Sequence, residues 1–263
     1  MLLRRISKHV REQNWTAIVI DFVIVVIGVF VGIQVSNWNE YVTTQRKAEH
    51  FTARLIDDLR LEAWAYESLI EYYDDVLHNA ERAIDAITGD NELSDEAFLI
   101  SAYRASNFGF NDRWRATFDE LIATGEIGLI NDEKVLATAI YVYNTPIFDI
   151  IMANGRNSEF RGIFRRTIPM NIQRELLKRC GDRYAAPLDY AAIVDLLDYE
   201  CALNISDNVI EDAARALRDD PAVLPALTIR FADLETALYL LTENRPDSLA
   251  SLREIAGVPS HQK

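Results

Sequence analysis

The sequence predicts an all-α protein in which a single N-terminal transmembrane helix is followed by a long helix and then by a helical-bundle extracytoplasmic domain. Residues 17–35 are apolar apart from Asp21 and Gln34. Neither glycine nor proline occurs in residues 33–88, an interval that favours one near-continuous helix. No two segments alternate apolar and polar residues around a hairpin turn, so no pattern indicates a β-sheet.

These patterns divide the chain into four expected parts. Residues 1–14 form a basic cytoplasmic leader, and residues 15–38 form the transmembrane helix. Residues 39–88 form a stalk and the first long helix of the outer domain, and residues 89–263 form the remainder of that helical domain. Residues 37–44 contain weak helix formers, so we expect either a kink there or, without one, a rigid stalk.

The apolar segment is long enough to cross a membrane. A helix of about 20 residues, rising 1.5 Å per residue, spans a hydrocarbon core of roughly 30 Å. The apolar core of a cleaved signal peptide is typically about 7–15 residues long, and no A-x-A-like site follows this segment, so we expect an uncleaved signal-anchor in contact with membrane lipid. Trp15 and Trp38 suit the two membrane interfaces, where an indole ring keeps its N–H hydrated.

Positive charge before the span predicts its orientation. The leader carries Arg4, Arg5, Lys8 and Arg11 close to the span, whereas the basic residues after it begin at Arg46. The positive-inside bias places the N-terminus in the cytoplasm. We therefore expect a single-pass protein of the bacterial inner membrane with a periplasmic C-terminal domain.

One side of the predicted span carries small residues. At about 100° per residue, a stripe of roughly 80° contains Asp21, Val25, Gly28, Gly32 and Ser36. Small residues four apart let two helix backbones approach closely. This helix-packing face therefore predicts contact with another transmembrane helix, from a second copy or from a partner protein. Because glycine is common in membrane helices, the alternative is an anchor without a specific partner.

The carboxylate of Asp21 strengthens the packing interpretation. A charged side chain costs about 2.5–3.5 kcal/mol at the centre of a membrane helix and less near its end, so it should be buried against a partner. The alternative is that Asp21 lies near the cytoplasmic headgroups, protonated or hydrated, and has no role.

Two segments of the chain carry a recognisable pattern. Residues 21–40 combine Asp21, Gly28, Gly32 and Gln34 with a closing Asn-Trp-Asn-Glu, and in residues 117–131 a helix ends at a glycine before a short turn. Both segments resemble a widespread bacterial family of uncharacterised single-pass membrane proteins, a domain of unknown function. The family more often has Glu at the position of Asp21. The resemblance implies the topology and no chemistry, because the family has no assigned function.

The outer domain is expected to be helical. Apolar residues recur at three- and four-residue steps on one buried stripe of the first long helix, namely Phe51, Leu55, Leu59, Tyr66, Leu69, Tyr73, Val76, Ala80, Ile84 and Ile87. Several helix ends are predicted from single residues. Ser94 and Asn131 are expected to cap helix N-termini, Gly125 to end a helix, and Pro146 to limit or bend the next one. Helices are expected at residues 94–107, 113–124, 132–144, 158–179, 188–199, 207–218, 222–244 and 247–255.

Opposite charges gather in two stretches. Residues 54–75 are rich in acid, with Asp57, Asp58, Glu62, Glu67, Glu71, Asp74 and Asp75. Residues 156–183 are basic, with Arg161, Arg165, Arg166, Arg174, Lys178 and Arg179. The stretches could meet, but we favour two solvated helix faces, because exposed pairs contribute about 0–1 kcal/mol each. The net charge of -14 argues against nucleic acid as a partner.

The chain has two cysteines, Cys180 and Cys201. In an oxidising periplasm they could pair, closing a loop of about 22 residues and stabilising the fold by roughly 3 kcal/mol. A short helix and Pro187 between them permit the chain to return. The alternative is two buried free thiols.

No constellation in the sequence specifies a reaction. The most suggestive helix face, formed by Glu71, Asp74, Asp75 and His78, offers too few converging ligands for a tight metal site. No G-x-S-x-G elbow, P-loop or H-E-x-x-H pattern occurs. We therefore expect no catalytic residue, no metal and no other cofactor.

Three functions are compatible with these features of the sequence. We favour a membrane-anchored, non-catalytic interaction protein, either homo-oligomeric or an accessory subunit of a larger inner-membrane assembly. The second is an extracytoplasmic ligand-binding sensor domain that acts through a membrane partner. We expect Tyr72, Tyr73, Tyr141 and Tyr143 to supply core and rim, although such aromatic residues also line ligand clefts. The third is an enzyme.

Overall fold

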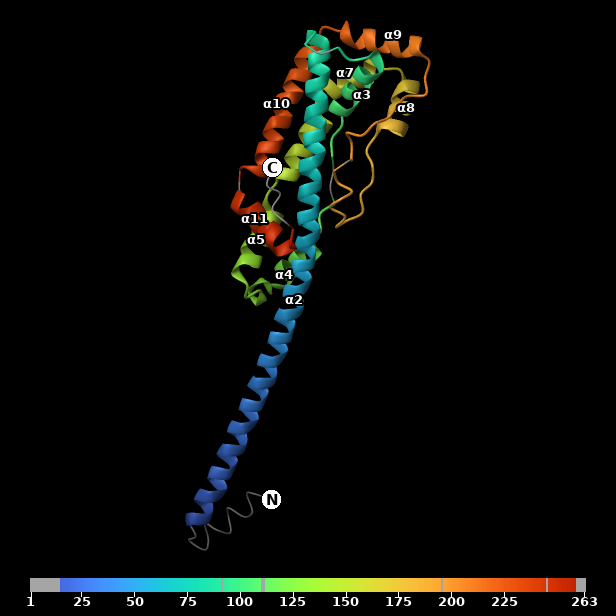
Figure 1. The fold of residues 1–263 in the computed structure, drawn as a ribbon. Coiled ribbons are helices and arrows are strands. Elements are labelled where there is room, and N and C mark those ends of the chain that lie inside the picture. The colour runs from blue at the N-terminus through green and yellow to red at the C-terminus, as the bar shows by residue number, and fades with distance from the viewer. Residues whose placement is uncertain (1–14, 91, 110–111, 195, 245, 259–263) are drawn as a thin grey trace. The chain divides into compact units, whose positions relative to one another are not determined.

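The regular structure of this protein is helical. The computed structural model describes residues 15–90, 92–109, 112–194, 196–244 and 246–258. Every regular element in those ranges is a helix, and no strand occurs within them (Figure 1). The all-α class expected from the sequence is therefore confirmed. The four basic residues of the leader lie outside the described ranges.

The first helix, α2 (Trp15–Thr88), is 74 residues long. Residues 37–44 are helical, so the weak helix formers there do not end it. The hydroxyl of Thr43 donates to the carbonyl oxygen of Asn39 at 2.8 Å, within the helix. The helix ends at Gly89, whose φ of 87° is readily adopted only by glycine.

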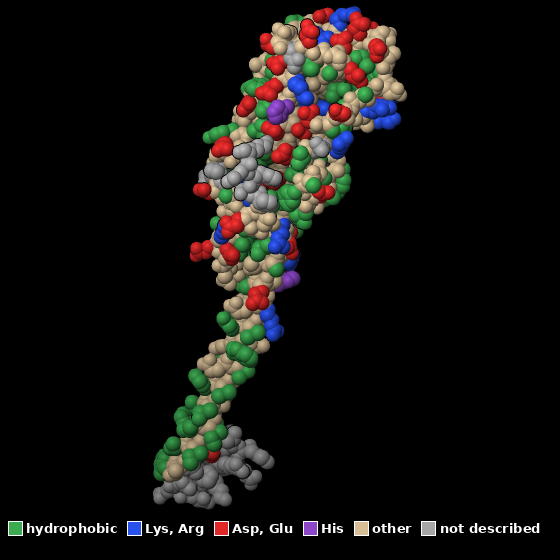
Figure 2. Space-filling model, viewed as in Figure 1, with side chains coloured by type: hydrophobic (Ala, Val, Ile, Leu, Met, Phe, Trp, Pro, Cys, Tyr) green, Lys and Arg blue, Asp and Glu red, His purple; other side chains and the backbone are tan. Residues whose placement is uncertain are grey.

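The chain divides into two compact units, residues 1–53 with 128–131 and residues 54–127 with 132–263. In the first unit, the helix that continues from Ile18 contains an apolar stretch with a mean hydropathy of 2.8. None of the residues of this stretch is buried within the protein. Figure 2 shows apolar side chains along this part of α2. By length and composition, this helix can cross a membrane.

A second apolar stretch belongs to the folded domain. Within residues Glu133–Thr167, one stretch has a mean hydropathy of 1.4, and 44% of that stretch is buried within the protein. Residues Glu133–Thr167 form three helices, α5 (Glu133–Asn144), α6 (Ile147–Arg156) and α7 (Glu159–Thr167). At 1.5 Å per residue, each is too short to cross a hydrocarbon core of roughly 30 Å.

The second unit is built around the C-terminal part of α2. In this unit the expected stripe, from Leu55 onward, is buried except for Ile84 and Ile87, which are half-buried. Burial also extends around the whole helix from residue 62 to residue 67. An α-helix enclosed on every side lies inside a fold, not on its surface. The stripe predicted from the sequence is therefore correct, but the other helices surround this part of α2 more completely than the stripe alone indicates.

Shorter helices form the rest of the second unit. Besides α5, α6 and α7, they are α3 (Asp95–Ala105), α4 (Ala116–Thr124), α8 (Met170–Cys180), α9 (Asp207–Arg218), α10 (Val223–Thr242) and α11 (Pro246–Ala256). A 3-10 turn (Ile127–Leu129) follows α4 in the chain. Helix α3 packs against α8 and α9, α7 packs against α9 and α10, α10 also packs against α6, and α11 packs against α5.

Local signals set most of the helix ends. The side chain of Ser94 caps α3, and Gly125 ends α4 with a φ of 70°. The carboxylate of Asp132 caps α5 by accepting from the N–H of Val135 at 3.0 Å. The expected cap at Asn131 is therefore wrong by one residue.

Two of the expected helices are wrong. Residues 158–179 form two helices, because Ile168 precedes Pro169 and takes an extended conformation with ψ of 128°. The described residues of 188–199 form turns and bends, not a helix. There, Leu188 has a φ of 70°, and the indole N–H of Trp64 donates to the carbonyl oxygen of Asp189 at 3.2 Å. Tertiary contacts thus replace the helix that the sequence favours.

Candidate functional site

The helix-packing face lies on the part of α2 that the protein itself does not cover. Val25, Gly28, Gly32 and Ser36 are exposed, and Asp21 is half-buried. A Cβ atom built at Gly28 or Gly32 meets no atom within 4 Å. Larger side chains at the two glycines would therefore cause no clash inside this chain.

The two expected interface anchors are exposed at opposite ends of the apolar part of α2. Trp15 is 71% exposed and Trp38 is 68% exposed. At 1.5 Å per residue they lie about 34 Å apart along the helix, close to the thickness of a hydrocarbon core. Their spacing thus suits one ring at each interface.

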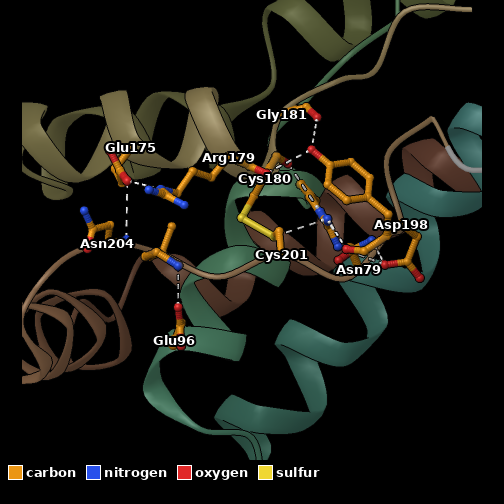
Figure 3. The surroundings of a disulfide bond; sticks show 12 residues. Asn79, Glu96, Glu175, Arg179, Cys180, Gly181, Asp198, Cys201 and Asn204 are labelled. Atoms are coloured by element: carbon orange, nitrogen blue, oxygen red, sulfur yellow. Dashed lines mark hydrogen bonds and ion pairs between the residues drawn. A yellow bond between two sulfur atoms is a disulfide. The ribbon is translucent and has the colours of Figure 1, made fainter.

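Cys180 and Cys201 are joined as a disulfide, with their Cα atoms 5.6 Å apart (Figure 3). The bond connects the last residue of α8 to a segment without helix. The hydroxyl of Tyr199 donates to the carbonyl oxygens of Gly181 at 2.7 Å and Arg179 at 3.1 Å. The two ends of the disulfide loop are therefore also held together by hydrogen bonds.

A buried arginine holds the same loop against α3. Arg104 donates from Nη1 to Oδ1 of Asp198 at 3.1 Å and from Nη2 to the carbonyl oxygen of Tyr199 at 2.7 Å. Arg82, on α2, donates to the same Oδ1 at 2.6 Å. Burial lowers the pKa of Arg104, and the carboxylate of Asp198 opposes that shift. These hydrogen bonds hold the loop against α2 and α3.

The suggestive acidic face on α2 does not assemble a metal site. Asp75 turns toward the loop and accepts from the N–H groups of Leu197 at 3.3 Å and Asp198 at 3.1 Å. Burial raises the pKa of Asp75 to about 6. Nδ1 of His78 lies 3.0 Å from the carbonyl oxygen of Asp74, in its own helix. Within the described part of the chain, no group of three or more His, Cys, Asp or Glu residues could hold a metal ion.

A buried ion pair connects α2 to the segment before α4. The side chain of Glu62 is 0% exposed, and its Oε2 accepts from Nε of Arg113 at 3.1 Å. Its Oε1 accepts from the N–H of Trp114 at 2.7 Å. Burial raises the pKa of Glu62, although the charge of Arg113 lowers it. The guanidinium of Arg113 lies 4.5 Å from the ring centroid of Phe148.

This pair was not predicted from the sequence, although a signal for it was present. Glu62 follows Leu59 by three residues and precedes Tyr66 by four, so it lies on the buried stripe. An acidic residue at a core position requires a buried partner. The identity of that partner, Arg113, depends on the tertiary fold.

The acidic stretch is neither wholly solvated nor paired as the sequence suggested. Its two buried members, Glu62 and Glu67, pair with Arg113 and Arg253, which lie outside the basic stretch. Both oxygens of Glu67 accept from Arg253, at 2.5 and 2.9 Å. The favoured interpretation of a solvated face is therefore wrong for these two carboxylates.

A cavity of about 460 Å³ opens between α3, α7 and α8. Three arginines and a carboxylate contribute to its wall, together with aromatic rings: Arg161, Arg165, Arg174, Asp182, Tyr103 and Phe108. From the sequence, the arginines were recognised only as part of a basic stretch. Their proximity to Tyr103 and Phe108, which lie more than 50 residues earlier, could not be predicted.

Buried contacts fix the wall that carries Phe108. Arg230, which is 2% exposed, donates from Nε to the carbonyl oxygen of Ala105 at 3.2 Å and from Nη2 to that of Asn107 at 2.7 Å. A Cβ atom at Gly155 would lie 2.6 Å from Cβ of Phe108. Glycine at this position therefore permits Phe108 to pack closely against α6.

Comparison of the chain with family models, with curated proteins and with solved structures finds no match.

Proposed function

We propose that this protein is a membrane-anchored, non-catalytic interaction protein, either homo-oligomeric or an accessory subunit of a larger inner-membrane assembly. The observation that carries the proposal is the apolar part of α2. This stretch has a mean hydropathy of 2.8, and none of it is buried within the protein. Such a surface requires a cover of lipid or of other apolar helices. The helix-packing face is the side on which a second transmembrane helix packs.

Two arguments support a periplasmic location of the folded domain. The basic leader with Arg4, Arg5, Lys8 and Arg11 favours a cytoplasmic N-terminus. The pairing of Cys180 with Cys201 is independent of the leader, because disulfides persist in oxidising compartments such as the periplasm. The resemblance of residues 21–40 and 117–131 to the uncharacterised single-pass family supports the same topology.

This topology predicts the behaviour of reporter fusions. Alkaline phosphatase fused after residue 258 should be active, because this enzyme folds only when it is exported. A fluorescent protein that folds only in the cytoplasm should not fluoresce when it is fused at the same position. The same reporters fused after residue 14, before the span, should give the reverse pattern. A fluorescent C-terminal fusion with an inactive phosphatase would place the domain in the cytoplasm and contradict the proposal.

Substitution of the small residues on the span tests the proposed contact directly. Changing Gly28 and Gly32 together to Ile should dissociate the protein from its neighbour, because the added side chains hold the two backbones apart while the span stays apolar enough to insert. Since a Cβ at either glycine meets open space in this chain, the fold itself should be unaffected. Crosslinking and native mass spectrometry of the membrane-extracted protein measure the loss.

Matched variants on the same helix serve as the control. Val29 and Ile33 each follow one of the two glycines and lie on another side of the span, so changing both to Leu should preserve the contact. Asp21→Asn removes the charge and retains a polar group, which reports on an ionic contribution. Unchanged oligomers or companions in the double Ile variant would show that the glycines are ordinary residues of an anchor.

A second candidate is an extracytoplasmic ligand-binding sensor domain that acts through a membrane partner. The cavity of about 460 Å³ favours it, because small-molecule sites typically occupy about 300–1,000 Å³. A sensor requires both a ligand and a membrane partner. Substitutions in the span test for the partner, and binding experiments on the cavity test for the ligand.

A further inference from the structure

The cavity between α3, α7 and α8 has an unusual charge for this protein. Its wall carries three guanidinium groups, on Arg161, Arg165 and Arg174, and one carboxylate, on Asp182. The chain as a whole has a net charge of -14. Arg165 is close enough to Arg161 that its charge contributes to lowering the pKa of Arg161, an effect led by burial. The cavity therefore concentrates positive charge on an acidic protein.

The carboxylate of Asp182 is already engaged at the edge of the cavity. Its Oδ1 accepts from the hydroxyl of Tyr72 at 3.2 Å and from Nδ2 of Asn107 at 3.3 Å. No ion pair joins it to an arginine of the wall among the described residues. The positive charge of the wall is thus only partly offset.

Arg165 and Arg174 differ from the arginines of the described chain that pair within their own helix. Arg115, Arg179 and Arg215 each pair with a carboxylate four residues away in the same helix. Within the described chain, Arg165 and Arg174 donate no side-chain hydrogen bond and form no ion pair.

The local sequence explains this difference. The residues three and four positions from Arg165 are Arg161, Gly162, Ile168 and Pro169, and those from Arg174 are Met170, Asn171, Leu177 and Lys178. No acidic side chain lies at helical pairing distance from either arginine. Both guanidinium groups consequently keep their donors available to a molecule in the cavity.

Arg161 and the aromatic rings form another part of the cavity wall. Nη1 of Arg161 donates to the carbonyl oxygen of Ser106 at 2.8 Å, and its guanidinium lies 4.8 Å from the ring centroid of Phe108. The ring of Tyr103 lies 6.1 Å from that of Phe164. This wall offers flat apolar surface next to fixed positive charge.

We propose that this cavity binds a small soluble organic anion, with a carboxylate or phosphate group attached to a planar or apolar body. Arg165 and Arg174 bind the anionic group, for which the guanidinium geometry is suited. Tyr103 and Phe108 contact the body of the molecule. The proposal does not depend on the span having a partner, so either can fail without the other.

Binding of phenyl phosphate tests the proposal. The full-length protein is placed in nanodiscs of zwitterionic lipid and titrated by calorimetry with phenyl phosphate, with phenol, and with inorganic phosphate. Phenyl phosphate should bind more tightly than phenol, which lacks the charge, and more tightly than inorganic phosphate, which lacks the ring. Equal affinity for phenyl phosphate and for either simpler compound would overturn the proposed ligand class.

A pair of double variants with the same net charge tests the residues. Arg165→Ala with Arg174→Ala should weaken phenyl phosphate binding by about tenfold or more, as expected for lost charge-assisted hydrogen bonds. Arg166→Ala with Lys178→Ala removes two charges from the same two helices outside the cavity wall and should leave the affinity within about twofold. Equal losses in the two variants, or no binding to the parent, would overturn the assignment.

Nanodiscs that contain anionic lipid separate a soluble ligand from a lipid headgroup. If the cavity takes a soluble anion, phenyl phosphate should bind with the same affinity in phosphatidylglycerol nanodiscs, at a salt concentration that screens the surface potential. Competition by phosphatidylglycerol that disappears in the Arg165 and Arg174 double variant would show that a lipid headgroup occupies the cavity and would contradict a soluble ligand. All variants should share the melting temperature of the parent, because the substituted side chains are exposed.

Discussion

Glu62→Ala is expected to destabilise the folded domain by about 3–5 kcal/mol, the typical cost of removing one partner from a buried ion pair. The substitution leaves the guanidinium of Arg113 without its carboxylate and the N–H of Trp114 without its acceptor. For a domain of this size, such a loss corresponds to a decrease of roughly 6–20 °C in melting temperature. Thermal unfolding of the solubilised protein, followed by circular dichroism, measures the decrease.

Two further variants separate the charge from the packing. Asp57→Ala removes an exposed carboxylate that pairs with Arg60 on the same helix, and it should change stability by about 0–1 kcal/mol. Glu62→Leu with Arg113→Met replaces both charges and should recover part of the loss, since apolar residues often replace a buried pair without penalty. A Glu62→Ala protein as stable as Asp57→Ala would show that Glu62 is hydrated and that the ion pair does not contribute.

Replacement of Cys180 and Cys201 by Ala is expected to destabilise the domain by about 3 kcal/mol, because the disulfide restricts a loop of the unfolded chain. The corresponding decrease in melting temperature is roughly 6–12 °C. Reductant should lower the melting temperature of the parent to that of the double variant and should leave the variant unchanged. Arg104 and Tyr199 continue to hold the loop in the variant, so we expect lower stability and not loss of the fold.

Mass spectrometry of the untreated protein checks the bond itself. The oxidised chain should be lighter than the reduced chain by the mass of two hydrogen atoms and should resist alkylation until reductant is added. Two thiols that react with an alkylating agent in the folded protein would exclude the bond, and with it the independent argument for a periplasmic domain.

The long helix and the all-α class could be derived from the sequence because they depend on interactions between near neighbours. Helical hydrogen bonds join residues four apart, so the absence of glycine and proline from residues 33–88 predicted one near-continuous helix there. The weak helix formers at residues 37–44 left a kink open, and the structure shows that the helix continues through them. Ser94 and Gly125 act through their own side chain or backbone on adjacent turns, and both helix ends were identified correctly.

Contacts between distant segments were decided only by the tertiary structure. Residues 188–199 have a helical pattern, yet Trp64 and Asp75 bind their backbone groups and hold them in turns. The same limit applies to the partner of Glu62 and to the cavity, whose arginines meet Tyr103 and Phe108 only after folding. The sequence determined the apolar N-terminal helix, the all-α class and many of the helix ends, because these follow from local spacing. The tertiary structure decided which buried charges pair and which arginines meet aromatic rings around the cavity, because both depend on which helices pack together.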